Sequence, residues 1–512
     1  MTTWLRRVSE HGPCLLGIDV GSSSTKAVLT TPSGEIVRTA SRSHTLSQPR
    51  PGWVEHDADA VWWTEIAELA RELTAPGGEV ATVCVSGIGP CLLALDAHDR
   101  PLRPAILYGI DTRSEREIAE LTGTYGADAI LARSGSALTS QAVGPKLLWL
   151  RRNEPDVWQR TRRFAMASSY AVLRLSGAYV LDRHSASQCD PLYDIVAGDW
   201  AADWADDIAP GLELPSLAWP AEIVGAVTIE AAEATGLRAG TPVCAGTIDA
   251  WAEAHSAGVR TGRDFMLMYG TTMFMLQVGT EPLAEPRLWT TVGISPGTIT
   301  YAGGLATSGA LTGWLREIAG GVPYDELLDG AGRVPAGSDG LVALPYFAGE
   351  RTPIHDPAAR GVIAGLTLRH GRDHVYRALL EASAYGIRHA LEAFDEAVGP
   401  GRRIVAVGGG ASRELWTQIV SDVTGEAQEV PRVTIGAAYG DALLAAQAAG
   451  LADANATWAT HERTVEPDAS VAARYDELYE IYGELRESTR NVQHRLARLA
   501  AGALEPVGGR QV

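Results

Sequence analysis

The sequence has few cysteines and no recognisable cysteine or histidine metal motif. Its five cysteines are scattered and mostly set in apolar runs such as CLLGID and VATVCVSG. An odd number of scattered cysteines argues against a disulfide framework, and the absence of CxxC and HExxH argues against the common zinc sites. We interpret these residues as reduced core thiols: Cys14, Cys84, Cys91, Cys189 and Cys244.

Long apolar runs and an excess of basic residues are also absent. No stretch approaches the roughly 18 uninterrupted apolar residues of a membrane span. The first residues, MTTWLRRVSEHGP, lack the apolar segment of a signal peptide. The formal net charge is −19, whereas nucleic-acid binding relies on concentrated Lys and Arg. We expect a cytoplasmic protein that binds neither a membrane nor a nucleic acid.

The length and composition predict two large packed domains. The 512 residues are too many for one ordinary core, because domains usually hold about 100 to 250 residues. Apolar residues make up 46% and charged residues 21%, which is typical of a globular protein. Strand patterns alternate with helical ones, so we expect an α/β fold with an interdomain cleft. We predict a first domain at residues 1–256, a second at 257–495 and a tail at 496–512.

One local pattern occurs twice in the chain. The apolar run CLLGID ends at Asp19, a small-residue turn follows, and KAVLTT continues as a second strand. Further on, DFMLMYGTTMFMLQVG repeats the order of strand, small-residue turn and strand. A helical pattern from Asp57 and a buried strand, ATVCVSG, follow the first copy. The chain therefore contains two copies of one unit.

The two turns are suited to polyphosphate. Glycine lets the backbone approach closely, and amides and hydroxyls donate hydrogen bonds to an anion. The candidate phosphate contacts are Gly21, Ser22, Ser23 and Ser24 in the first turn and Gly270, Thr271 and Thr272 in the second. Taken alone, each turn is more typical of an ordinary hairpin than of a phosphate site. Their equivalent positions in a duplicated unit favour phosphate binding.

Two aspartates are candidates for the chemistry. Asp19 ends the first strand beside the turn, where its carboxylate could hold Mg²⁺ or simply cap the turn. Asp249 lies in VCAGTIDAWAEA, where a strand gives way to a helix. It could accept the proton of an alcohol during phosphoryl transfer, or cap the helix. Lys26, in the second strand, could contact phosphate or could simply be a solvent-exposed lysine at the edge of the sheet.

Together these motifs resemble those of the FGGY carbohydrate kinases, in the same order along nearly the whole chain. GIDVGSSSTKAVL is similar to the first phosphate motif of that family, YGTT to its second, and VGGGASRELWTQIVSDVTG to its adenosine motif. Residues 361–385, GVIAGLTLRHGRDHVYRALLEASAY, are similar to its C-terminal signature. The resemblance implies two actin-like, ribonuclease H-like ATPase domains and a small sugar or polyol as substrate. It also implies ATP and Mg²⁺ as cofactors, and it leaves a homodimer open.

The resemblance also implies a role for individual residues. Asp19 corresponds to the metal ligand and Asp249 to the catalytic base. Gly270, Thr271 and Thr272 correspond to phosphate contacts, and the glycines that correspond to the nucleotide site are Gly309, Gly313, Gly409 and Gly410.

The substrate is expected to be a ketose or polyol, with a pentulose favoured. GERTPIHDPAARGVIAGLT (residues 349–367) and GWVEHDADAVWW (residues 52–63) look most like the xylulokinase branch of the family, with gluconate kinases close behind. Members of the xylulokinase branch usually have Gln-Met-His after the Ser-Gly of SGIGPCLLALD, where this chain has Ile88, Gly89 and Pro90. We therefore place Gly89 and Pro90 beside the sugar and keep gluconate, a tetritol and a tetrulose as alternatives. Asp111, with Arg113, is either a sugar contact or part of a structural salt bridge.

Other classes of protein fit the sequence less well. A G-x-S-x-G string at residues 293–297 suggests a serine hydrolase, but Pro296 has no backbone N–H for the oxyanion hole of that class. A Walker A lysine motif and a complete GxGxxG are absent. A non-catalytic actin-like ATPase switch would share the phosphate turns, yet it would lack the C-terminal signature and the GERTP segment.

Overall fold

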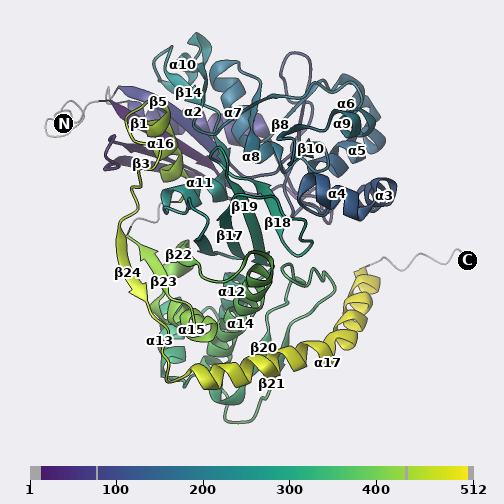
Figure 1. The fold of residues 1–512 in the computed structure, drawn as a ribbon, viewed down its shortest axis with the longest axis vertical. Coiled ribbons are helices and arrows are strands. Elements are labelled where there is room, and N and C mark those ends of the chain that lie inside the picture. The colour runs from purple at the N-terminus through teal and green to yellow at the C-terminus, as the bar shows by residue number, and fades with distance from the viewer. Residues whose placement is uncertain (1–12, 76–78, 433–435, 505–512) are drawn as a thin grey trace, which may run out of the picture. The chain divides into compact units, whose positions relative to one another are not determined.

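The structure is a computed structural model that describes residues 13–75, 79–432 and 436–504. Its contacts divide the chain into two compact units, each of which combines a mixed sheet with helices (Figure 1). Unit 1 comprises Met1–Gly262, Val278–Thr300 and Ile435–Ala459, and unit 2 comprises Arg263–Gln277, Tyr301–Thr434 and Thr460–Val512. No helix in the described part of the chain is long and apolar enough to span a bilayer.

The larger elements of unit 1 begin with the expected meander and helix. Its sheet strands are β1 (Cys14–Val20), β2 (Ser24–Thr30), β3 (Ile36–Ser43), β5 (Val80–Gly87), β13 (Ile223–Ala226), β14 (Pro242–Cys244) and β15 (Thr247–Ile248). Its helices are the π-helical turn η1 (Ala58–Trp63), α2 (Thr64–Thr74), α3 (Glu115–Tyr125), α4 (Ala127–Ser134), α5 (Val143–Asn153), α6 (Pro155–Arg160), α7 (Ala167–Ser176), α8 (Arg183–Ala186), α9 (Ala202–Ile208), α10 (Ile229–Thr235), α11 (Asp249–Ser256) and α16 (Ala437–Ala448). Short strands complete it: β4 (Glu55–His56), β6 (Leu93–Leu95), β7 (Ala105–Ile106), β8 (Arg163–Ala165), β9 (Val180–Asp182), β10 (Tyr193–Asp194), β11 (Asp199–Trp200), β12 (Ser216–Ala218) and β18 (Trp289–Val292).

Unit 2 is built from the second copy of the pattern and from longer helices. Its strands are β16 (Asp264–Tyr269), β20 (Val342–Leu344), β21 (Val362–Ala364), β22 (Arg403–Val407), β23 (Gln428–Pro431) and β24 (His461–Val465), together with most residues of β17 (Met273–Gly279) and β19 (Ile299–Leu305). Its helices are α12 (Gly309–Ile318), α13 (Tyr324–Arg333), α14 (Arg372–Val398), α15 (Glu414–Thr424), α17 (Ala472–Leu504) and the short η2 (Ser338–Gly340) and η3 (Gly409–Ser412). Residues 496–504 of the predicted tail are thus the last turns of α17.

The two sheets have the same strand order, which confirms the predicted duplication. Six strands of each seven-stranded sheet follow it: β13-β14-β5-β1-β2-β3 in the first and β24-β23-β22-β16-β17-β19 in the second, with β15 added beside β5 and β18 beside β19. In both, the first strand of the meander pairs antiparallel with the second, β1 with β2 and β16 with β17. On its other side it pairs in parallel with a later strand, β5 or β22. The carboxyl ends of these parallel strands therefore lie at one edge of each sheet.

Close packing of a helix against β1 holds the first sheet in place. All seven residues of β1 are buried, and α16 packs across this strand. Gly17 makes the approach feasible, because a Cβ at this position would lie 2.0 Å from the carbonyl oxygen of Ala438. A side chain there would push α16 away from the strand that ends in Asp19.

Candidate active site

The two predicted catalytic aspartates lie at the same edge of the unit 1 sheet. Asp19 of β1 is opposite Ser86 of β5 in the parallel register. On the other side of β5, Thr247 of β15 pairs in parallel with the same Ser86, so Asp249 begins α11 directly beyond the strand end. Two carboxylates that are far apart in the sequence are thus brought to either side of one strand.

Asp249 has the environment of a weak base. Its Oδ1 accepts a hydrogen bond from the backbone N–H of Ala250 at 2.7 Å. Burial raises the pKa of Asp249 to about 6, although this N–H and the positive charge of Lys26 act in the opposite direction. A carboxylate with this pKa is ionised at neutral pH and accepts a proton more readily than an exposed aspartate does.

Other acidic side chains influence the ionisation of Asp19. Burial raises the pKa of Asp19 well above its ordinary value, and the carboxylates of Asp249 and Asp441 raise it further. Lys26, opposite Asp19 in the β1–β2 hairpin, lowers this pKa, and Glu253 raises it. Four acidic groups and one lysine therefore influence one another here, and a bound cation would favour the ionised form of each acid.

The residues present fit Mg²⁺. Oδ1 of Asp19 is buried and has no hydrogen-bond partner among the described residues. The described residues hold no cluster of three or more His, Cys, Asp or Glu side chains arranged for a metal. Mg²⁺ is usually bound by one or two carboxylates together with water and substrate phosphates, so one open carboxylate oxygen matches its requirements.

The first predicted phosphate turn links β1 to β2. The N–H of Gly21 donates to the carbonyl oxygen of Ser24 at 3.0 Å, and Ser22 and Ser23 lie between them. His44 braces this turn, because its Nε2 lies 3.1 Å from the carbonyl oxygen of Gly21. The turn is therefore fixed by a hydrogen bond within it and by the side chain of His44. Its contact with phosphate stays a prediction.

Two acidic residues of this site were missed by sequence reasoning. Glu253 lies one turn after Asp249 on α11, and burial and Asp249 raise the pKa of Glu253 to about 7. The spacing of four residues along a helix was a signal for this residue. Asp441 comes from α16 and is fully buried against Ser86. No pattern in the neighbouring sequence pointed to Asp441, because only the packing of α16 on the sheet brings this residue near Asp19.

Gly89 and Pro90 follow the end of β5. A Cβ on Gly89 would lie 2.6 Å from Cγ1 of Ile248, the residue that precedes Asp249. Glycine therefore allows close packing next to the start of α11. Pro90 is buried and Gly89 is partly exposed, and the contact of these two residues with a sugar stays a prediction.

Asp111 forms a buried ion pair. Its Oδ2 accepts hydrogen bonds from the backbone N–H of Val54 at 2.7 Å and from Nη2 of Arg113 at 2.7 Å. Arg113 also donates to Glu55 at 2.8 Å, and the side chains of Asp111 and Arg113 are fully buried. The structural salt bridge considered for this pair is thus present. A sugar contact of Asp111 stays a prediction.

Unit 2 contains a cavity of about 330 Å³ that brings together most of the predicted nucleotide residues. It is lined by Tyr269, Gly270, Thr271, Gly309, Thr312, Tyr324, Leu328, Tyr376, Leu380, Gly409, Gly410, Arg413 and Trp416. Thr272 lies in the adjoining turn, and Gly313 lies one helical turn beyond Gly309 on α12, outside this lining. The phosphate and adenosine motifs therefore meet at one cavity, while the roles of Thr272 and Gly313 stay predictions.

Two glycines give the cavity its shape. A Cβ on Gly309 would lie 2.6 Å from the carbonyl oxygen of Gly270, and a Cβ on Gly410 would lie 2.6 Å from the ring of Trp416. Larger residues at either position would displace the second phosphate turn or the tryptophan. These glycines are therefore closely packed within unit 2, and their approach to a nucleotide stays a prediction.

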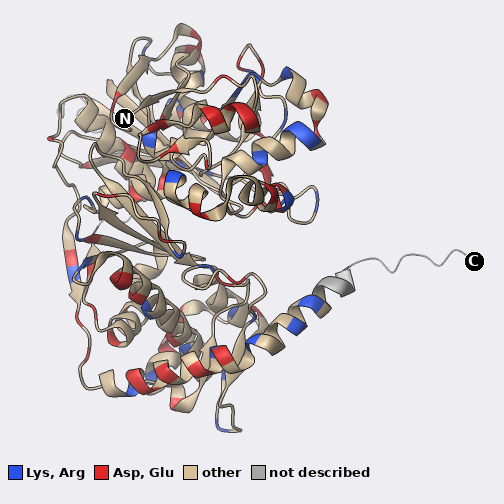
Figure 2. Cartoon of the chain, turned by 45° about the vertical axis from the view of Figure 1, so that its right-hand side comes forward, with Lys and Arg blue, Asp and Glu red and all other residues tan. Residues whose placement is uncertain are grey.

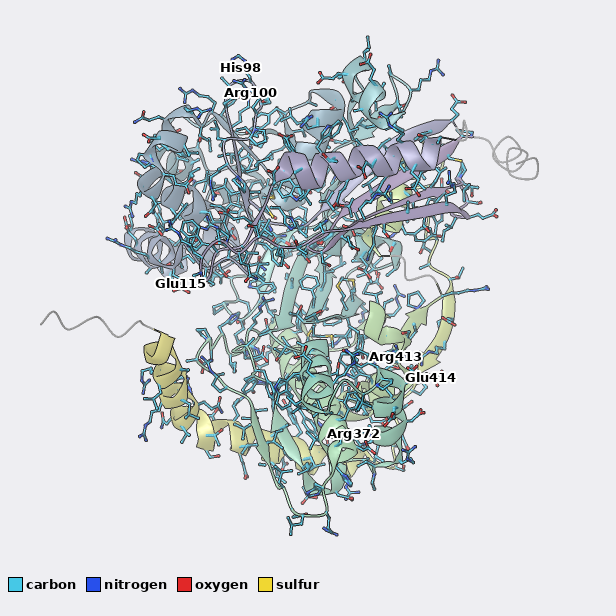
Figure 3. The ribbon with its side chains drawn as sticks, turned by 180° about the vertical axis from the view of Figure 1, so that it is seen from behind. His98, Arg100, Glu115, Arg372, Arg413 and Glu414 are labelled. Atoms are coloured by element: carbon cyan, nitrogen blue, oxygen red, sulfur yellow. The ribbon has the colours of Figure 1, made fainter. Side chains whose placement is uncertain are left out.

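The apolar and aromatic wall of the cavity was not foreseen from the sequence. Its residues come from three helices: Tyr324 and Leu328 from α13, Tyr376 and Leu380 from α14, and Trp416 from α15. Arg413, labelled with Glu414 at the start of α15 in Figure 3, donates to Asp325 at 2.8 Å. Flat apolar surfaces of this kind suit the base of a nucleotide.

Comparison with known proteins identifies the family. The N-terminal domain of the FGGY family of carbohydrate kinases matches residues 14–254, and the C-terminal domain of that family matches residues 265–449. The chain belongs to the FGGY family of carbohydrate kinases.

Individual FGGY kinases resemble the chain over most of its length. A xylulose kinase of Lactococcus lactis subsp. lactis (strain IL1403) is 29% identical over 504 residues, which cover 94% of this chain and 98% of the relative. A glycerol kinase of Nocardia farcinica (strain IFM 10152) is 31% identical over 471 residues, covering 86% and 92%. The crystal structure of xylulose kinase from Rhodospirillum rubrum superimposes with a TM-score of 0.85 at 33% identity, covering 94% and 100%.

Because the chain belongs to the FGGY family, its enzyme class is known. The chain is a phosphotransferase that acts on a sugar hydroxyl, with ATP as the phosphate donor of the family. The predicted two-domain α/β fold is confirmed by the match to a solved FGGY kinase. A serine hydrolase and a non-catalytic actin-like switch are excluded.

Proposed function

We propose that this FGGY kinase phosphorylates a hydroxyl of a pentulose, with Asp249 as the catalytic base. The observation that carries the catalytic assignment is the position of Asp249 and Asp19 on either side of the end of β5. The xylulose kinases similar to the chain over 94% of its length support a pentulose as the acceptor.

Asp249 accepts the proton of the attacking hydroxyl. The proton must leave as the oxygen bonds to phosphorus, and a carboxylate whose pKa is about 6 binds it more strongly than an ordinary aspartate does. Lys26, which lowers the pKa of Asp249, keeps this group ionised before the reaction. Most of the remaining acceleration in phosphoryl transfer comes from positioning and charge stabilisation.

Asp19 holds Mg²⁺ through its unpaired Oδ1. When bound, Mg²⁺ neutralises polyphosphate charge. The Asp19→Asn variant should need at least tenfold more Mg²⁺ for half-maximal ADP release, because one ionic oxygen ligand is replaced by a neutral one. A metal requirement equal to that of the wild type would contradict this role.

The surface beside the base limits how the sugar is held. Gly89 has no side chain, and Pro90 has neither a side-chain donor nor a backbone N–H. Ile248 packs directly against Gly89. Hydroxyl contacts on this side must come from water or from other residues, so discrimination among ketoses should be weaker than in a site with polar side chains here.

A substrate panel tests the proposal. Ketoses, polyols and aldonates of three to six carbons are compared by coupled ADP release and ranked by kcat/KM. A pentulose should rank first, ahead of gluconate, glycerol, a tetritol and a tetrulose. The Asp249→Asn protein, purified in the same way, controls for contaminating kinases. If another class of acceptor were preferred by a hundredfold, about 2.7 kcal/mol in transition-state free energy, the pentulose assignment would be wrong.

A further inference from the structure

Glu350 lies in the GERTP segment and is a buried acid of unit 2. The residue is 5% exposed, and it forms no ion pair with any residue that the structure describes. Burial raises the pKa of Glu350 to about 7. The acidic residues in the first half of α17, red in Figure 2, are by contrast exposed to water. Because burying an acid without a cation destabilises a fold, stability does not explain why a glutamate stands here.

One carboxylate oxygen of Glu350 joins two distant segments. Its Oε1 accepts hydrogen bonds from the backbone N–H of Arg351 at 2.7 Å and from that of Ala306 at 2.8 Å. The other oxygen, Oε2, is buried and has no hydrogen-bond partner among the described residues. Ala306 is 44 residues away in the sequence and begins the short link, residues 306–308, between β19 and α12. The carboxylate therefore holds the start of this link.

The residues around Glu350 hold the same part of the chain. The N–H of Thr352 donates to the carbonyl oxygen of Gly304 at 3.1 Å, and the N–H of Gly304 donates to Oγ1 of Thr352 at 3.2 Å. The hydroxyl of Thr307 donates to the carbonyl oxygen of Pro345. The chain is therefore fixed on both sides of the residue that Glu350 binds.

The far end of the link is bonded to the second predicted phosphate turn. The N–H groups of Ser308 and Ala310 donate to the carbonyl oxygen of Thr271 at 3.1 and 3.0 Å. The N–H of Gly309 donates to the carbonyl oxygen of Gly270 at 3.0 Å. Both residues of the turn line the unit 2 cavity. A displacement of the link would therefore displace the turn as well.

We propose that Glu350 is a positioning residue that holds the second phosphate turn in the geometry that binds the nucleotide. Glu350 is not among the residues that line the cavity, so it acts through the link and not by contact with the ligand. A carboxylate suits this task, because its hydrogen bonds are about twice as strong as those of a neutral acceptor. The role rests on the proposed function, since the ligand of the unit 2 cavity is taken to be ATP.

Nucleotide affinity of the full chain tests this role. Glu350→Asp keeps the charge but is one CH₂ shorter, so it can still reach the adjacent N–H of Arg351 and cannot reach Ala306. Isothermal titration calorimetry with ADP and MgCl₂ should show a dissociation constant raised by roughly tenfold. The KM for ATP should rise in parallel, with a smaller effect on kcat and almost none on the KM for the sugar.

Two further variants serve as matched comparisons. Glu350→Gln retains the length of the side chain and an oxygen that accepts from Ala306, so it should restore most of the affinity for ADP. Glu317→Gln makes the same chemical change at an exposed position on α12 and should leave ADP binding as in the wild type. A Glu350→Asp protein that bound ADP as tightly as the wild type would overturn the positioning role.

Thr352→Val separates positioning from stability. It removes the acceptor of the Gly304 N–H and leaves the bond between Glu350 and Ala306 in place. Thermal unfolding should show a loss of stability, whereas ADP affinity should change little. Equal losses of affinity in Thr352→Val and Glu350→Asp would mean that Glu350 only stabilises the fold.

Gly309→Ala tests the cavity itself, because the added methyl group would lie 2.6 Å from the carbonyl oxygen of Gly270. It should weaken ADP binding. If Gly309→Ala weakened binding and Glu350→Asp did not, the positioning role would be wrong and the nucleotide role of the cavity would stand. If Gly309→Ala bound ADP normally, the nucleotide role of the cavity would be wrong, and the role of Glu350 with it.

Discussion

Asp441 of α16 accepts two hydrogen bonds from Ser86 at the end of β5. Its Oδ2 lies 3.1 Å from the backbone nitrogen of Ser86 and 2.6 Å from the hydroxyl oxygen. Ser86 in turn pairs in register with Asp19. A residue near the end of the unit 1 sequence therefore holds the strand that separates Asp19 from Asp249, the two proposed catalytic aspartates.

Asp441 should be replaceable by asparagine but not by leucine. Burial raises the pKa of Asp441 well above its ordinary value, so the folded protein favours the neutral acid, which asparagine resembles. Leucine would leave both donors of Ser86 unpaired, at a cost of about 1 to 3 kcal/mol each. We expect urea unfolding to show a loss below about 1 kcal/mol for Asp441→Asn and a several-fold larger loss for Asp441→Leu. Equal stability of the two variants would show that the hydrogen bonds do not matter.

Asp249→Asn should lower kcat by roughly 10² to 10⁴ and leave the KM for the sugar nearly unchanged. Asparagine has almost the same size and can still accept from the N–H of Ala250, but it cannot take the proton. Initial rates of ADP release measure both parameters. The matched control is Glu253→Gln, one turn along α11, which should cost less than tenfold. A loss of similar size in both variants would refute the assignment of the base.

Gly410→Ala should destabilise unit 2 and weaken nucleotide binding, whereas Gly409→Ala should cost little stability. The added methyl group at Gly410 would meet Trp416 at 2.6 Å, but a methyl group at Gly409 would meet nothing within 4 Å. Overpacking of this kind costs about 1 to 3 kcal/mol. Thermal unfolding and the KM for ATP measure the two effects. If the two variants unfolded at the same temperature, the close contact with Trp416 would not limit residue size.

His255 should lower the free energy of unfolding of the protein at acid pH. Burial lowers the pKa of His255 from 6.5 to about 3, and the charge of Arg260 lowers it further. The unfolded chain therefore binds a proton as the pH falls below 6.5, while the folded chain does not until about pH 3. The contribution of a neutral His255 is fully present above pH 6.5 and is lost progressively below it, by about 2 kcal/mol between pH 7.5 and pH 5.

Comparison of the wild type with His255→Gln isolates this effect. Glutamine does not titrate and keeps a side-chain amide that can reach Gln447, the partner of His255 at 2.9 Å. The difference in free energy of unfolding between the two proteins should shift by about 2 kcal/mol in favour of the variant when the pH falls from 7.5 to 5. Other titrating groups cancel in this difference. A constant difference would mean that His255 has the same pKa in the folded and unfolded protein.

The sequence by itself determined the local parts of this protein. Its strand and turn patterns specified the β1–β2 and β16–β17 hairpins, since side-chain periodicity and small turn residues act over a few positions. The order of the motifs was enough to indicate the family and to single out Asp19 and Asp249.

Only the tertiary structure decided which distant residues meet. Asp441 reaches Ser86 because α16 crosses β1, and the wall of the unit 2 cavity forms because residues of three helices meet the turn at Gly270 and Thr271. Gly89 proved to be a packing requirement of Ile248 rather than merely a missing side chain. Such contacts leave no local pattern, because they depend on strand order and helix packing between segments that are far apart in the chain.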